Sequence, residues 1–129
     1  MRLLVDTHTF YWMVDHAENL GEGARSVLED ASNELYLSAA TLWEIATKHR
    51  IGKFPAGALL IGNLHRLVDK LGLKELPISF EHAITSGSLE WEHRDPFDRM
   101  LAAQCVIEDL RLVTRDEVFE TLEPVRTIW

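Results

Sequence analysis

The segment RLLVDTHTFYWMVD (Arg2–Asp15) decides the class of fold. Its first five residues, Arg2–Asp6, form a short apolar run that ends at an acid, which is typical of a β-strand. The next residues, Thr7–Asp15, predict a helix. The same order of strand and helix returns along the chain, with further strands predicted at Glu34–Ser38, 73–78, Arg111–Thr114 and 124–129.

Helices are predicted between these strands, over 22–31, 39–52, 58–72, 79–91 and 95–110, with a turn or short helix at 115–122. Gly52 and Gly72 are natural stops for two of them, and Gly87 predicts a break in a third. Strands that alternate with helices favour an α/β fold with a mainly parallel sheet covered on both faces. Right-handed crossovers place the carboxyl ends of such strands at one edge, where we expect the working site.

Length and composition narrow the class of protein. A chain of 129 residues is long enough for one domain, so we predict a single domain over 1–129. The formal net charge of −8 argues against broad, charge-driven binding of nucleic acid. The single cysteine, Cys105, excludes an internal disulfide and lies in an apolar helical run, which favours a packing role. The first residues form neither a signal peptide nor a membrane span, so we expect a cytoplasmic protein.

Four acids from distant parts of the sequence are expected at the carboxyl edge of the sheet. Asp6 ends the first strand, and Asp116 follows the strand Arg111–Thr114 after one residue. Glu44 and Asp98 lie near the starts of two helices that leave the same edge. Clustered carboxylates repel one another, so such a group needs a shared cation. Oxygen ligands suit Mg²⁺ or Mn²⁺, and no histidine or cysteine spacing indicates zinc.

Each acid also has an ordinary local interpretation. Asp6 can cap the following helix, and Asp116 can serve a turn. Asp95 before Pro96 is a typical N-cap with proline at the first helical position, which leaves any role at the metal open. Asp98 stands at the capping-box position of that helix, but its helical ridge is apolar, which favours a functional role.

Two capping boxes remain possible from the sequence alone. Glu44 closes a box with Thr41 if the helix begins there, and is free one turn inside the helix if Ser38 is the cap. Asp116 lies within TRDE, which matches a box from Thr114 to Glu117. No single acid is therefore diagnostic, and the shared edge is the evidence.

These segments resemble the PIN-domain nucleases, and among them the VapC-type toxins of bacterial toxin–antitoxin pairs. The resemblance covers essentially the whole chain, through LLVDTH, LSAATLWEIATK, DPFDRMLAAQ and LVTRDEVF. It places the four family acids at Asp6, Glu44, Asp98 and Asp116, with Thr114 as the nearby hydroxyl. Asp95 belongs to a subgroup motif and not to the general quartet.

The resemblance implies a three-layer α/β/α sandwich and Mg²⁺- or Mn²⁺-dependent hydrolysis of RNA phosphodiesters, usually within a homodimer. It also implies a small antitoxin that binds across the active-site groove. In that mechanism the four acids hold the metal, and Thr7 or Thr114 orients a water or an acid. The best basic candidates for contacts to the RNA backbone are Lys48–Lys53, His93, Arg94 and Arg99. Lys48 can equally pair with Glu44 on the helix surface, and a plain surface charge is favoured for Arg99. Core or dimer contacts are favoured over base stacking for Trp12, Trp43, Trp91 and Trp129.

Three other functions are compatible with clustered acids in an α/β fold. A structure-selective DNA nuclease would use the same metal site. A phospho-accepting receiver domain needs a lysine at a late strand end, where this chain has Arg115. A degenerate PIN domain that only binds RNA would not need the intact quartet. No dinucleotide-binding or Walker glycine motif is present.

Overall fold

The computed structural model describes residues 1–129 and contains one five-stranded sheet in which every pairing is parallel. The strand order is β3-β2-β1-β4-β5, so the direction of winding reverses between β1 and β4. This confirms the predicted parallel α/β sheet. The strands are β1 (Arg2–Val5), β2 (Glu34–Ser38), β3 (Leu73–Leu76), β4 (Arg111–Val113) and β5 (Thr127–Ile128).

Seven α-helices connect these strands, together with the 3-10 segments η1 (Ala17–Asn19) and η2 (Glu117–Thr121). The helices are α1 (Thr7–Val14), α2 (Glu22–Glu29), α3 (Ala39–Arg50), α4 (Gly57–Gly62), α5 (Leu64–Leu71), α6 (Phe80–Ser88) and α7 (Pro96–Glu108). None of them has the length and apolar character that crossing a bilayer requires.

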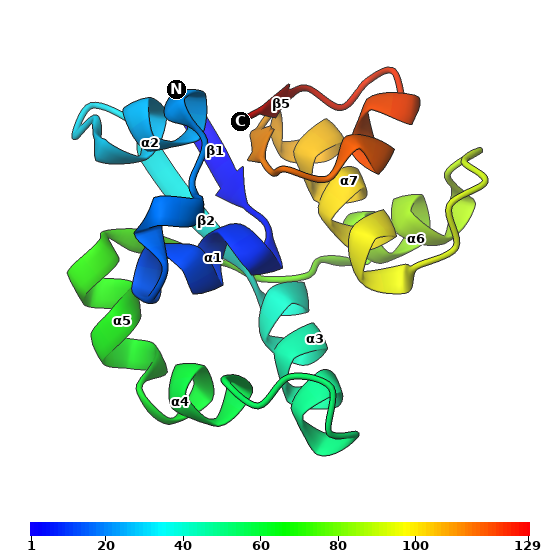
Figure 1. Cartoon of the computed structure of the whole chain (residues 1–129). Helices are drawn as coiled ribbons and strands as arrows, with labels where there is room; N and C mark the ends of the chain where they lie inside the picture. Colours follow the sequence, from blue (N-terminus) through cyan, green and yellow to red (C-terminus); the bar gives the residue numbers. More distant parts are fainter.

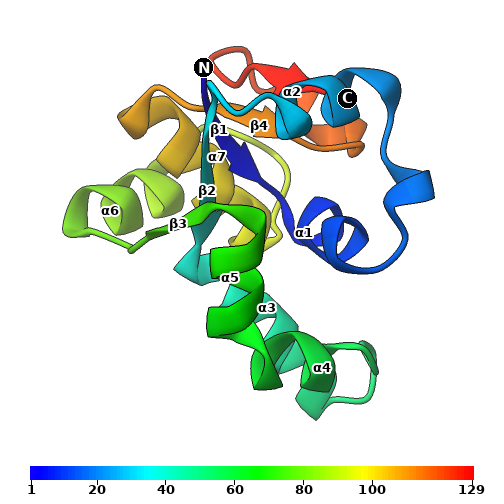
Figure 2. The same cartoon turned by 90° about the vertical axis from the view of Figure 1, so that its left-hand side faces the viewer.

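The sheet is the middle of three layers (Figures 1 and 2). Alternate residues of β1 enter opposite cores, because successive side chains of a strand point to opposite faces. Leu4 packs with Leu101 and Phe119 on the side covered by α6 and α7. Leu3 packs with Phe10 and its neighbours on the side covered by α1, α2 and α5. The two cores explain why the central strands are almost wholly apolar.

One predicted helix is wrong, because residues 58–72 form two helices, α4 and α5, with Asn63 between them. The Asn63 amide donates a 2.8 Å hydrogen bond to the Leu59 carbonyl, which competes with helix continuation after Gly62. Apolar side chains of both helices still pack into one core, since Leu60 of α4 and Leu67 of α5 belong to the same buried cluster.

The predicted break near Gly87 is confirmed to within one residue, because α6 runs through Gly87 and ends at Ser88. Glycine weakens a helix without preventing one, and a capping box between Ser79 and His82 secures the beginning of α6. The last strand is shorter than predicted, since β5 contains only Thr127–Ile128.

Candidate active site

The candidate site lies where the sheet reverses its winding, at the carboxyl ends of β1 and β4. Loops from neighbouring strands diverge at such a point and leave a crevice between them. Asp6 follows β1 directly, and Thr114 follows β4 directly. The Thr114 hydroxyl donates a hydrogen bond to Asp6 Oδ2, which ties the two strand ends together inside the protein.

Asp6 caps a helix, and its side chain also lies at the candidate site. It is the N-cap of α1, where its Oδ1 accepts a 2.8 Å hydrogen bond from the Thr9 N–H. The side chain also lines the cleft that the other predicted acids line, which we call the acidic cleft, although the residue is only 8% exposed. Burial raises the pKa of Asp6, and the hydrogen bonds from Thr114 and Thr9 work against that rise.

Glu44 lies inside α3, because the helix begins earlier than Thr41. Ser38 is the N-cap, and its hydroxyl accepts a 3.0 Å hydrogen bond from the Ala40 N–H. The Thr41 capping box is therefore wrong. The Glu44 carboxylate is buried, accepts a hydrogen bond from the Thr7 hydroxyl and pairs with Lys48 Nζ at 2.5 Å.

Lys48 is more than an exposed partner of Glu44. Its side chain lines the acidic cleft and is partly buried. Burial disfavours its charge, but the hydrogen bond and charge of Glu44 outweigh burial, so the pKa of Lys48 is raised. The ammonium group therefore stays charged and supplies the positive charge that the cluster of carboxylates needs.

Asp98 occupies the first turn of α7 and faces His93 from the preceding loop. His93 Nε2 and Asp98 Oδ2 are 2.7 Å apart. Burial raises the pKa of Asp98 to about 6, the hydrogen bond with His93 opposes this, and the charges of Asp95 and Glu44 raise it further. The surroundings of Asp98 therefore disfavour its charged form, and a nearby cation would favour it.

Asp95 and Asp116 both cap helices. Asp95 Oδ1 accepts hydrogen bonds from the Phe97 and Asp98 N–H groups at 2.9 and 3.0 Å, with Pro96 at the first helical position, as predicted. Asp116 is the N-cap of η2, which excludes the box from Thr114. Instead the Asp116 N–H donates to the Thr114 hydroxyl at 3.0 Å, so Thr114 links Asp6 to Asp116.

The acidic cleft has a volume of about 210 Å³, and each of the segments described above contributes residues to its lining. It has no hydrophobic lining residue and is formed by Asp6, Thr7, His8, Glu44, Lys48, Asp95, Asp98 and Asp116. The four predicted acids thus reach one cleft from β1, α3, α7 and the loop after β4. Their roles in catalysis stay a prediction.

The donor set of this cleft fits Mg²⁺ or Mn²⁺, because all of its carboxylates offer oxygen atoms. No group of three or more acidic, histidine or cysteine side chains is arranged around a single point, however. Glu44 is turned to Lys48 and Asp98 to His93, so each of these two carboxylates already has one oxygen paired with a neighbouring side chain. The Thr41 hydroxyl, one turn before Glu44 in α3, is buried without a hydrogen-bond partner.

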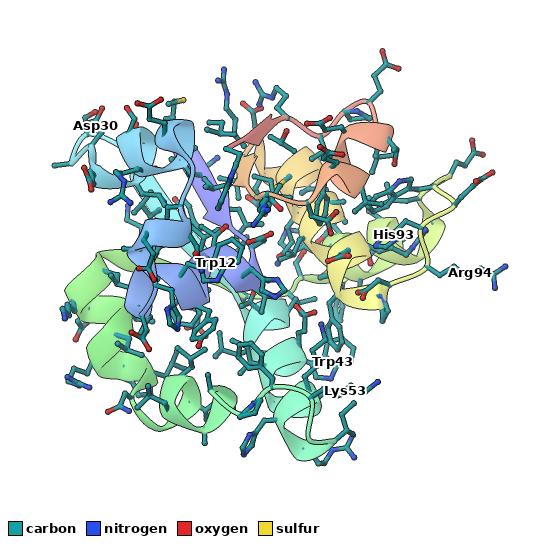
Figure 3. The ribbon with its side chains drawn as sticks, viewed as in Figure 1. Trp12, Asp30, Trp43, Lys53, His93 and Arg94 are labelled. Carbon is teal, nitrogen blue, oxygen red and sulfur yellow. The ribbon has the colours of Figure 1, made fainter.

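Arg99 holds the loop before α7 and is not free to bind phosphate. Its guanidinium donates four hydrogen bonds of 2.7–3.0 Å to backbone carbonyl groups, those of Ser86, Leu89, Trp91 and His93. Neither predicted role, surface charge or phosphate ligand, matches this arrangement. Arg99 instead fixes the backbone that presents His93 to Asp98. Figure 3 shows Arg94 on the same loop, pointing away from the body of the protein.

The single cysteine is buried, and three of the four tryptophans are half-buried against other aromatic side chains. Burial raises the pKa of the Cys105 thiol to about 12, in accord with a packing role. Trp91 packs beside Phe119, and Trp12 beside Trp129. Trp43 is the exception, since it is 53% exposed and contacts the edge of Phe97 between α3 and α7.

Sequence reasoning missed two residues of the site. Gln104 is buried and joins α7 to the start of α3, because its Oε1 accepts a 2.5 Å hydrogen bond from the Ser38 hydroxyl. A glutamine inside an apolar helical stretch was the available signal. His8 lines the acidic cleft beside Asp6 and Thr7, and only its position after the first acid pointed to it.

Comparison with known proteins agrees with this architecture. Residues 3–123 match the model of the PIN domain. Ribonuclease VapC16 of Mycobacterium tuberculosis (strain ATCC 25618 / H37Rv) is 34% identical over 62 residues, a segment that covers 48% of this chain and 43% of that protein.

Solved structures with the same fold include VapBC2 from Rickettsia felis bound to a promoter DNA fragment, with a TM-score of 0.72 at 16% identity. DNA-bound VapBC from Salmonella typhimurium has a TM-score of 0.68 at 20% identity. Each match covers 98% of this chain, and 97% and 96% of the respective relatives. At these identities the likeness concerns the fold, which is the predicted three-layer sandwich. The family match extends over nearly the whole sequence, and this chain belongs to the PIN-domain family.

Proposed function

We propose that this chain is a divalent-metal-dependent endoribonuclease that acts as the toxin of a toxin–antitoxin pair. The observation that carries the proposal is the acidic cleft, where carboxylates from four separate segments meet at the switch point of a PIN-domain sheet. The similarity to a protein named as a ribonuclease supports RNA as the substrate.

Asp6, Glu44, Asp98 and Asp116 are the residues that would hold Mg²⁺ or Mn²⁺. The ion, when bound, makes a coordinated water more acidic and balances charge on the phosphate oxygens. Several neighbours would keep the carboxylates in position. Thr114 holds Asp6 and the Asp116 backbone, and Thr7 holds Glu44.

Lys48 and His93 have a different part in this proposal. Both pair with carboxylates of the cleft: Lys48 offsets the charge of Glu44, and His93 shares a hydrogen bond with Asp98. If Glu44 held a cation, Lys48 would keep its position at the wall of the cleft with less need to pair with that carboxylate. There it would face the anionic substrate.

A labelled RNA oligonucleotide and its DNA counterpart test the proposed activity. We expect purified protein to cut the RNA with Mg²⁺ or Mn²⁺ and to stop in EDTA, and Asp6→Asn to lose most activity. Asparagine preserves the helix cap and changes only the charge, so its circular dichroism spectrum should match the wild type. Cutting that persists in EDTA would overturn the metal mechanism, and preferential cutting of DNA would favour the structure-selective DNA nuclease.

The proposed partners are a cognate antitoxin and a second copy of this chain, within the cytoplasm of the producing cell. The similar structures are toxin–antitoxin complexes, which supports the first of these partners. We expect expression of the chain alone to arrest growth, and co-expression of the small neighbouring gene product to relieve the arrest. Harmless accumulation of folded protein in a host without that neighbour would contradict the toxin role.

A further inference from the structure

Three hollows follow one another across the carboxyl edge of the sheet, and His8 lines all of them. The acidic cleft is in the middle. On one side it shares Thr7, His8 and Lys48 with a hollow of about 260 Å³, which we call the Lys53 hollow. On the other side it shares Asp6, His8 and Asp116 with a hollow of about 410 Å³ that contains Arg115. The three hollows make a continuous path past the four acids.

An anionic substrate needs local cations on this path, because a net charge of −8 gives no general attraction. Many of the 13 lysine and arginine side chains are already engaged. Those paired with acids or backbone carbonyls are Arg2, Arg25, Lys48, Lys74, Arg99 and Arg126. Lys53 is exposed, makes no ion pair or side-chain hydrogen bond, and lines a hollow beside the acids.

The end of α3 places Lys53 at this wall. Gly52 has a φ of +78°, and its N–H donates to the His49 carbonyl at 3.0 Å. The Lys53 N–H donates to the Lys48 carbonyl at 2.8 Å. These two hydrogen bonds form a Schellman motif, which turns the chain back along the helix it ends. The motif explains why Lys53 and Lys48 line the same hollow.

The next residue anchors this turn to the first helix of the site. The Phe54 ring meets the Tyr11 ring of α1 edge to face, with 5.3 Å between centroids. The backbone of Lys53 is therefore held between α3 and α1, while its side chain remains unpaired. Figure 3 shows Lys53 beside the lower part of α3, just below Trp43. A fixed backbone with a free ammonium group suits recognition of a phosphate by point charge.

We propose that Lys53, together with His8 and Lys48, binds a backbone phosphate of single-stranded RNA next to the phosphate that is cleaved. This subsite rests on the proposed ribonuclease function and adds the direction in which the substrate crosses the site. The strand enters over the Lys53 hollow, passes the acids and leaves toward Arg115. The lysine acts on binding, since it lies outside the acidic cleft.

Binding of a fluorescein-labelled single-stranded RNA, followed by anisotropy at several KCl concentrations, tests this subsite. Asp116→Asn serves as the parent protein to keep the RNA intact, which a gel verifies after each titration. Adding Lys53→Ala should raise Kd about five- to tenfold and reduce the slope of log Kd against log salt by about 0.7, the value for one phosphate contact on a single strand. Lys53→Arg should restore both, because it keeps the charge.

Lys70→Ala is the matched control, since Lys70 is exposed on α5 and lines none of the three hollows.

In the protein without the Asp116→Asn substitution, Lys53→Ala should raise KM about fivefold and leave kcat within about twofold, as expected for a contact made equally before and during reaction. If Lys53→Ala matches Lys70→Ala in Kd and salt slope while the wild type cuts RNA, the subsite is wrong and the proposed function stands. If the wild type neither binds nor cuts RNA, both are wrong.

Discussion

Asp98→Asn separates a metal ligand from an ordinary helix-start residue by its effect on stability. Burial and the neighbouring acids raise the pKa of Asp98 from 3.8 to about 6. The folded protein therefore binds a proton more tightly than the unfolded chain, and the stability of the metal-free protein falls as pH rises from about 4 to about 6. A difference of two pKa units corresponds to at most about 3 kcal/mol. We expect about half of this, because the side chain is still partly exposed to water.

Asparagine at position 98 has no charge to bury and can still accept a hydrogen bond from His93. The variant should therefore be more stable than the wild type at pH 7 without metal, and should lack the decline between pH 4 and 6. Mn²⁺ should reverse this order of stability between the two proteins. The wild type should gain about 2.7 kcal/mol at a Mn²⁺ concentration one hundred times Kd, or about 10 °C in melting temperature, and the variant should lose most of that gain.

Thermal melts of both proteins, with and without Mn²⁺ at three pH values, measure these shifts. Asp95→Asn is the matched control, because it removes a charge from the same cleft and keeps the helix cap. It should retain the full Mn²⁺ shift. An Asp98→Asn protein that is less stable than the wild type without metal, and equally stabilised by Mn²⁺, would show that Asp98 only starts the helix.

Three other substitutions test the surroundings of the site. Thr114→Val removes the hydroxyl that joins Asp6 to Asp116, so a melt should show a loss of about 1–3 kcal/mol from an unsatisfied buried carboxylate, with Ser as the rescuing residue. Gly52→Ala should lower the free energy of unfolding by about 1 kcal/mol in a denaturant titration, because the φ of +78° strains a residue with a side chain even though no atom lies within 4 Å of the added methyl group. Gly62→Ala has equal space and an ordinary φ, so in the same titration it should be neutral or stabilising. Arg99→Lys should destabilise the protein by about 2 kcal/mol or more, since an ammonium group cannot reach all four carbonyl groups. Amide hydrogen exchange should increase first in residues 86–94. Unchanged exchange there would contradict the role of Arg99 in holding the loop.

The layers and the sheet were predictable because their pattern is local. The first strand and the strand Glu34–Ser38 begin and end as predicted, to within one residue, since each is an apolar run between clear turn signals. The helix predicted over 58–72 was wrong for a different reason. Gly62-Asn63 and Gly87 are similar signals in the sequence and a helix ends at or next to each, but only Gly87 was interpreted as a break.

The placement of the acids was predictable only as a shared edge, because each one satisfies a local rule as well. Asp6, Asp95 and Asp116 cap helices in the structure, and the cap alone explains their position. Their meeting in one cleft follows from the order of the strands, which no local segment contains. The hydrogen bonds of Arg99 and Gln104 were not predictable, since their partners lie in other elements of the fold.

Glu44 shows how the local and the global arguments join. A glutamate six residues into α3 has no orphan N–H group to cap, so helix chemistry gives no reason for its burial. A buried carboxylate costs several kcal/mol unless it is paired, and here Lys48 and Thr7 supply the partners. Replacing all three by apolar residues would remove that cost. Glu44 and Lys48 therefore lie at the switch point of the sheet without a reason in helix capping, and the proposed cation and anionic substrate give each of them one.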